Sequence, residues 1–130
     1  MKKTMFLLLL PLFSACGKND TIYPLTETIW GTPEVLHVPD NVGFYSTKLG
    51  SYEFKSDGTY KAIIGSNTLE AKWDWLVKGE KFKLDYEGQV THNEIFTILS
   101  MQDTLLHVKK RNEGESENNG NYWELKYRPY

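Results

Sequence analysis

Residues 51–64 read SYEFKSDGTYKAII, an alternation of apolar and polar side chains interrupted by an Asp-Gly pair at positions 57–58. Period-two alternation is typical of a half-buried β-strand, because successive side chains point to opposite faces of a sheet. Glycine accepts the positive φ that two-residue hairpin turns require, so the Asp-Gly pair predicts a tight turn. We therefore expect two antiparallel strands, with Tyr52 and Phe54 on the same face as Tyr60.

The same alternation continues on both sides of this hairpin. The clearest example is LEAKWDWLV, residues 69–77, in which every second side chain is apolar. The first strand region is expected to bend near Pro33, because proline cannot donate to a sheet ladder. Further strands are expected at residues 28–38, 69–77, 82–86, 91–100, 104–110 and 122–128. The connections are too short for parallel crossovers, so about eight strands form an antiparallel meander.

A meander with one apolar face needs a way to cover that face. Closing the sheet into a barrel does so and also removes the exposed edge strands. An eight-stranded barrel has an interior just wide enough for side chains or for one small ligand. The chain has 130 residues, which suits one domain, and 14% of them are aromatic, which favours an all-β fold. We expect a small all-β barrel.

The N-terminus carries a separate signal. Two lysines precede an apolar run of eleven residues, 5–15, which is shorter than the roughly 20 residues that a membrane-spanning helix needs. The run matches a secretory signal peptide, and Ser14 and Ala15 directly precede the only cysteine, Cys16. This arrangement resembles a bacterial lipobox, in which the peptidase cuts before the cysteine and the cysteine thiol carries a diacylglycerol. The alternative is an ordinary signal peptide with a coincidental cysteine. We expect a signal peptide at 1–15, a lipidated tether at 16–27 and a barrel domain at 28–130.

Composition and motifs exclude several function classes. The net charge of −2 and pI near 5.9 give no electrostatic basis for binding nucleic acid. A single cysteine allows neither an intramolecular disulfide nor a cysteine-built zinc site. His37, His92 and His107 lie on three separate segments without metal-ligand spacing, and no phosphate loop or nucleophile motif is present. We therefore expect a monomeric protein that is not an enzyme and holds no cofactor or metal.

Several short motifs follow one another in a familiar order. After the lipobox come Ile-Trp-Gly at 29–31, the hairpin at 52–60, Lys-Trp-Asp-Trp at 72–75, Thr-Leu-Leu-His-Val at 104–108 and Tyr-Trp-Glu-Leu-Lys-Tyr-Arg at 122–128. This order is similar to that of the lipocalin-like small lipoproteins of Bacteroidota, over residues 28–130. The resemblance implies a small lipocalin-like barrel in the bacterial cell envelope, lipid-anchored to the outer membrane, with its periplasmic or surface face left open.

The candidate ligand site is the aromatic side of the strands. Its members alternate with polar residues and are therefore expected to point inward: Tyr52, Phe54, Tyr60, Trp73, Trp75, Phe82, Tyr86 and Trp123. Two interpretations remain open, because these rings could fill a solid core or line a pocket for a small hydrophobic ligand. His107 and Thr97 are the expected inward polar groups.

Two functions follow from these interpretations. The first is a membrane-anchored lipoprotein that binds a small hydrophobic molecule inside the barrel. The alternative is a non-enzymatic protein-binding module, such as an envelope inhibitor or assembly factor, with a solid core. In that case the partner would contact the long loops at 40–50 and 111–121, the second of which is polar, acidic and expected to be solvated.

Overall fold

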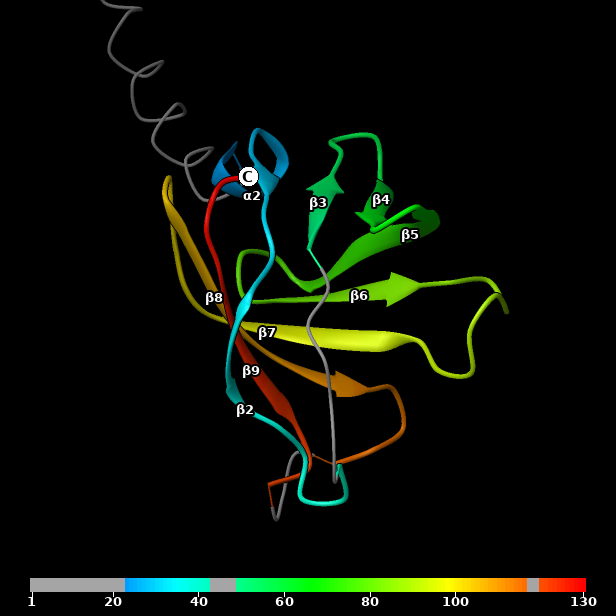
Figure 1. Cartoon of the computed structure of the whole chain (residues 1–130). Helices are drawn as coiled ribbons and strands as arrows, with labels where there is room; N and C mark the ends of the chain where they lie inside the picture. The colour runs from blue at the N-terminus through cyan, green and yellow to red at the C-terminus, as the bar shows by residue number, and fades with distance from the viewer. Residues whose placement is uncertain (1–22, 43–48, 117–119) are drawn as a thin grey trace, which may run out of the picture.

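The computed structural model describes residues 23–42, 49–116 and 120–130 (Figure 1). The expected signal peptide, Cys16 and the first part of the tether lie outside the described residues. The elements are α2 (Tyr23–Thr26), β1 (Ile29–Trp30), β2 (Glu34–His37), β3 (Gly50–Phe54), β4 (Thr59–Ile64), β5 (Asn67–Val77), β6 (Lys81–Asp85), β7 (Glu94–Gln102), β8 (Leu105–Asn112) and β9 (Trp123–Tyr127). The all-β prediction is confirmed, and the described strands form one antiparallel sheet curled into a half-barrel (Figure 1).

The middle of the sheet is the expected meander. Strands β3 to β9 lie side by side in chain order, and every neighbouring pair is antiparallel. Apolar side chains alternate with polar ones along these strands, and the buried set lies on one face. The period-two pattern in the sequence therefore corresponds to the concave, buried face of the half-barrel.

The first strand region differs from the expectation. It is interrupted at residues 31–33 and forms two strands, which join opposite edges of the meander. Strand β1 pairs with β3, and β2 pairs with β9, so the sheet order is β1-β3-β4-β5-β6-β7-β8-β9-β2. The described sheet consequently has nine strands rather than about eight. The break contains Pro33, whose missing N–H prevents a continuous ladder.

Residues 29–31 are hydrogen-bonded on both sides. On one side β1 pairs with β3, and on the other Gly31 N donates to Arg128 O at 2.7 Å while Tyr130 N donates to Ile29 O at 2.8 Å. The hydroxyl oxygen of Thr32 also accepts a bond from Gly50 N at 2.9 Å, which ties the bend to the start of β3. These contacts join the two margins of the meander through the N-terminal segment.

The folded part begins before the expected end of the tether. Residues 23–26 form the short helix α2, and the Leu25 side chain is fully buried in the core. The carbonyl of Leu25 accepts a hydrogen bond from the Trp30 indole nitrogen at 3.3 Å. We expected the tether to extend to residue 27. The earlier start of the folded part could not be predicted, because a single buried leucine produces no periodic pattern in the sequence.

The turn between β3 and β4 contains three residues rather than two. Gly58 N donates to Lys55 O at 3.0 Å and Lys55 N donates to Thr59 O at 2.8 Å, so residues 56–58 form the loop. Only Gly58 has a positive φ, of 92°, while Asp57 accepts bonds from both the amide and the hydroxyl of Thr59. Glycine was required as expected, at the third loop position of the hairpin. Among the described residues, no helix is long and apolar enough to cross a membrane.

The two residues of β1 offer a direct test of how the sheet margins are joined. Trp30 is fully buried, whereas its neighbour Ile29 is 47% exposed. We expect Trp30→Ala to lower the free energy of unfolding by about 3–5 kcal/mol, because it leaves a large cavity in the core. Ile29→Ala should cost about 1 kcal/mol or less. Urea unfolding of both variants measures the difference, and equal losses would contradict the anchoring role of Trp30.

Candidate ligand-binding cavity

All eight aromatic residues of the candidate site lie in the hydrophobic core or pack against it. They do not, however, form one continuous site. Four of them, Phe54, Trp73, Trp75 and Phe82, pack against one another, and the other four line a cavity. The two interpretations that the sequence left open therefore apply to different parts of the interior.

The packed part is centred on Phe82. Its ring stacks on Phe96 at a centroid distance of 4.8 Å and meets Phe54 edge-to-face at 5.1 Å. Trp75 and Trp73 lie edge-to-face with Phe82 at 5.8 and 6.0 Å, and the Trp73 indole nitrogen donates to Lys55 O at 2.8 Å. Such offset and edge-to-face arrangements are the preferred geometry of aromatic cores. These rings fill the core, and of them Phe96 also contributes to the wall of the cavity described next.

The second part of the interior is a cavity of about 480 Å³. Four of the candidate residues, Tyr52, Tyr60, Tyr86 and Trp123, line it, and Tyr127 joins them from β9. The aliphatic part of the wall comes from β2, β4, β5 and β9 and consists of Val35, Ala62, Ile64, Leu69 and Leu125. A wall that is mostly apolar and aromatic is typical of small-molecule sites.

Two charged residues that were not predicted lie in this wall. Glu94 of β7 and Lys110 of β8 form an ion pair, with 3.1 Å between Lys110 Nζ and Glu94 Oε2. Their side chains are only 19% and 23% exposed. The Tyr86 hydroxyl donates to Glu94 Oε1 at 2.5 Å, and the Lys110 ammonium lies 5.4 Å from the centroid of the Trp123 ring. This ion pair is the polar centre of the cavity.

The prediction that His107 and Thr97 point inward is wrong. His107 lies on the outer face of β8, between the buried Leu106 and Val108, and its Nε2 is 2.7 Å from Glu124 Oε2. Thr97 lies between Phe96 and Ile98, both of which pack in the core, and so also points outward. Because residues 95–99 are mostly apolar, the sequence pattern did not show which side chains of this strand point inward. Alternation counted from Phe96 and Val108 would have placed Glu94 and Lys110 inside.

The tyrosines of the cavity are held in their neutral form. Burial raises the pKa of Tyr60, Tyr86 and Tyr127 well above the ordinary value of 10.0, and the negative charge of Glu94 raises each of them further. Burial and the charge of Glu94 also raise the pKa of Tyr52. The same carboxylate thus acts on all four tyrosines of the cavity wall, and the Tyr86 hydroxyl contacts it directly.

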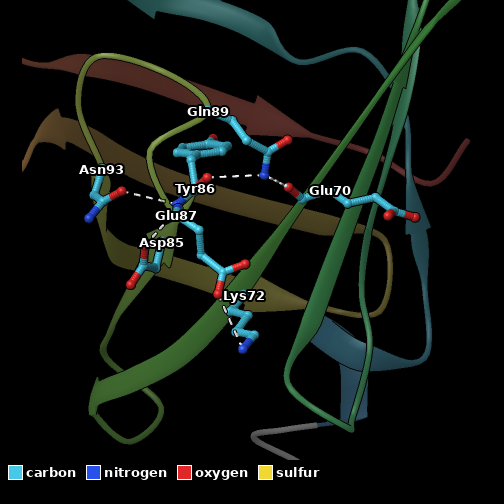
Figure 2. Close-up of polar contacts among 7 residues, drawn as sticks. All are labelled: Glu70, Lys72, Asp85, Tyr86, Glu87, Gln89 and Asn93. Carbon is cyan, nitrogen blue, oxygen red and sulfur yellow. Dashed lines mark hydrogen bonds and ion pairs between the residues drawn. The ribbon is translucent and has the colours of Figure 1, made fainter.

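The segment between β6 and β7 forms one rim of the cavity (Figure 2). Tyr86 N donates to Asn93 Oδ1 at 3.0 Å, which closes the base of the loop. Gln89 Nε2 donates to Tyr86 O at 3.0 Å and to Glu70 O of β5 at 2.9 Å. Lys72 of β5 adds an ion pair with Glu87 at 3.2 Å. The rim, which contributes Val90 and His92 to the cavity wall, is therefore fixed to β5.

The acidic segment after β8 is largely exposed over its described residues, as expected, and it also makes specific polar contacts. Glu113 forms an ion pair with Lys83 at 2.9 Å and accepts a hydrogen bond from Asn93 Nδ2 at 3.3 Å. These two bonds lower the pKa of Glu113. Arg111 Nη1 donates to Glu115 O at 2.8 Å, so the segment is tied to itself and to the rim loop. Residues 117–119 of this loop and 43–48 of the other expected loop lie outside the described residues.

The three histidines lie apart from one another. The His37 ring stacks on Tyr122 at 4.4 Å, His107 contacts Glu124, and His92 is at the cavity rim. Within the described ranges, no group of three or more His, Cys, Asp or Glu residues could hold a metal ion. Comparisons with protein-family models, with curated proteins and with solved structures find no match to this chain.

Alkaline titration tests the state of the tyrosines. The pKa values of Tyr60, Tyr86 and Tyr127 are raised in the folded state, so their contribution to stability is complete below pH 10 and is lost as the pH rises further. We expect part of the tyrosinate absorbance to develop only as the protein unfolds, because these three tyrosines ionise at that point. Far-ultraviolet circular dichroism recorded in parallel reports unfolding. Ionisation of all eight tyrosines in the folded protein would contradict the buried cluster.

Proposed function

We propose that the chain is a lipid-anchored lipoprotein of the bacterial cell envelope that binds one small, mostly apolar molecule in its curled sheet. The observation that carries this proposal is the cavity of about 480 Å³, with its aromatic and aliphatic wall and its single ion pair. Ligand pockets in proteins typically have volumes of roughly 300–1,000 Å³ and a few polar groups in an apolar wall. The alternative protein-binding module with a solid core does not account for this space.

The shape of the sheet supports a lipocalin-like barrel. Residues 29–31 bond to β3 on one side and to residues 128–130 on the other, which brings the margins of the meander together. The antiparallel meander and the interior cavity are the features that the resemblance to lipocalin-like lipoproteins implies. In this proposal the half-barrel is the ligand-binding part, and the packed cluster around Phe82 gives it a rigid base.

The anchor is proposed from the N-terminal sequence. The short apolar run at 5–15 and the Ser-Ala-Cys that ends at Cys16 are those of a lipoprotein signal peptide. One acyl chain holds a protein only marginally at a membrane, whereas two or more hold it firmly. A diacylglycerol on Cys16 would therefore fix the domain to the outer membrane without a membrane-spanning segment.

Metabolic labelling tests the anchor. The full chain is produced in a bacterium that processes lipoproteins, in the presence of an alkyne-bearing fatty acid. We expect label on the wild-type chain in the membrane fraction and none on Cys16→Ala, because the thiol is the attachment point. A label of equal strength on Cys16→Ala, or an unlabelled wild-type chain, would refute the anchor.

Native mass spectrometry tests the ligand. The mature chain 16–130 with Cys16→Ser is incubated with an envelope extract and purified without detergent. We expect additional mass that disappears after organic extraction. Leu69→Trp should reduce it, because Leu69 lines the cavity and the larger side chain occupies part of the space.

The matched control is Thr68→Trp, which adds the same side chain at the adjacent, exposed position on the outer face of β5. It should retain the additional mass. Thermal unfolding of both variants establishes that they fold. A clean apo mass for the parent chain, or equal retention by Leu69→Trp and Thr68→Trp, would count against the cavity as a ligand site.

A further inference from the structure

We infer that the cavity selects an uncharged ligand whose polar end carries several hydrogen-bonding groups, such as hydroxyls or ester carbonyls. This inference rests on the proposed ligand-binding function and specifies the chemical class of the ligand. It is carried by two observations: the paired charges of Glu94 and Lys110, and the four tyrosines that line the same cavity.

The ion pair disfavours ligands of either charge. Glu94 and Lys110 lie 3.1 Å apart, so a ligand carboxylate placed beside the ammonium would also stand beside Glu94. A ligand ammonium placed beside Glu94 would likewise meet Lys110. Binding either ion would require the pair to separate and would leave one member unpaired in a largely buried position, which is strongly unfavourable. The other ionisable lining groups are the four tyrosines, which are held neutral, and the exposed His92 at the rim.

The tyrosines provide uncharged hydrogen-bonding groups. Only the Tyr86 hydroxyl is committed to Glu94, and no described residue hydrogen-bonds to the hydroxyls of Tyr52, Tyr60 and Tyr127. The described part of the chain contains no fully buried side-chain nitrogen or oxygen that lacks a partner, so these three hydroxyl oxygens are not completely buried. All three residues line the cavity, while Tyr60 and Tyr127 are only 6% and 7% exposed overall.

Three free hydroxyls, each able to donate and to accept, match a neutral head group with several oxygens. A neutral group satisfies them without disturbing the ion pair. The apolar part of the same ligand can contact the aliphatic wall, which includes Val35, Ile64 and Leu69. The geometry therefore fits an amphiphile with an uncharged head better than a fatty acid or an alkylamine.

The test compares three probes that share an octyl-length chain: 1-octanoylglycerol, octanoate and octylammonium. Each is titrated at neutral pH and below its micellar concentration into the mature chain 16–130 with Cys16→Ser, and binding is measured by calorimetry. We expect the neutral probe to bind at least about tenfold more tightly than either ion.

Charge variants establish which groups set this preference. Glu94→Gln leaves Lys110 unpaired and should raise the affinity for octanoate, whereas Lys110→Gln leaves Glu94 unpaired and should raise the affinity for octylammonium. The matched control is Lys83→Gln, which breaks the 2.9 Å ion pair with Glu113 outside the cavity and should leave all three affinities unchanged. Thermal unfolding confirms that each variant folds, and the two cavity variants give independent readings.

The possible results distinguish the preference for neutral ligands from the ligand-binding function itself. Preference for the neutral probe, with opposite gains for the two cavity variants, supports the inference. Octanoate or octylammonium binding to the parent chain as tightly as 1-octanoylglycerol would overturn the selection of neutral ligands and leave the ligand-binding function standing. Failure of all three probes to bind the parent chain and both variants would overturn the inference and the proposed function together.

Discussion

The two-sided pairing of residues 29–31 is the constraint on which the rest of the structure depends. This short segment bonds to β3 on one side and to the last residues of the chain on the other, with the fully buried Trp30 at its centre. Because the chain then bends and adds β2 to β9, the N-terminal segment covers part of both edges of the meander. The sheet is thereby curled and given an interior, which a flat meander would lack.

Within that interior, the phenylalanine and tyrosine rings lie in different surroundings. Phe54, Phe82 and Phe96 have no polar atom and pack ring against ring. The tyrosines, whose hydroxyls need partners, gather around Glu94 or face the cavity. A partly buried carboxylate is tolerated here because Lys110 neutralises it and Tyr86 donates to it. The ion pair with the neighbouring tyrosines and the packed phenylalanine rings are thus two parts of one interior.

Much of the fold could be predicted from the sequence, because it depends on local patterns. Period-two alternation gave the order of strands β3 to β9, and the eight inward aromatics follow from the same pattern. The placement of β1 and β2 on opposite edges could not be predicted, because β1 pairs with residues more than 20 positions away and β2 with residues about 90 positions away. Glu94 and Lys110 were missed because charged residues in strands normally face solvent, and the register of β7 and β8 is obscured by a bulge between Ile98 and Ser100.

The interior combines a solid core with a cavity that we propose to bind a ligand, and the four tryptophans report on both parts. Trp123 lines the cavity, whereas Trp30 and Trp73 are buried in the core and Trp75 packs against it. The most direct measurement is nuclear magnetic resonance of the ¹⁵N-labelled indole groups during titration with 1-octanoylglycerol. The account predicts that the Trp123 resonance shifts with saturation while the other three stay in place. Comparable shifts of Trp73 and Trp75, or no shift of Trp123 when the probe binds, would contradict it.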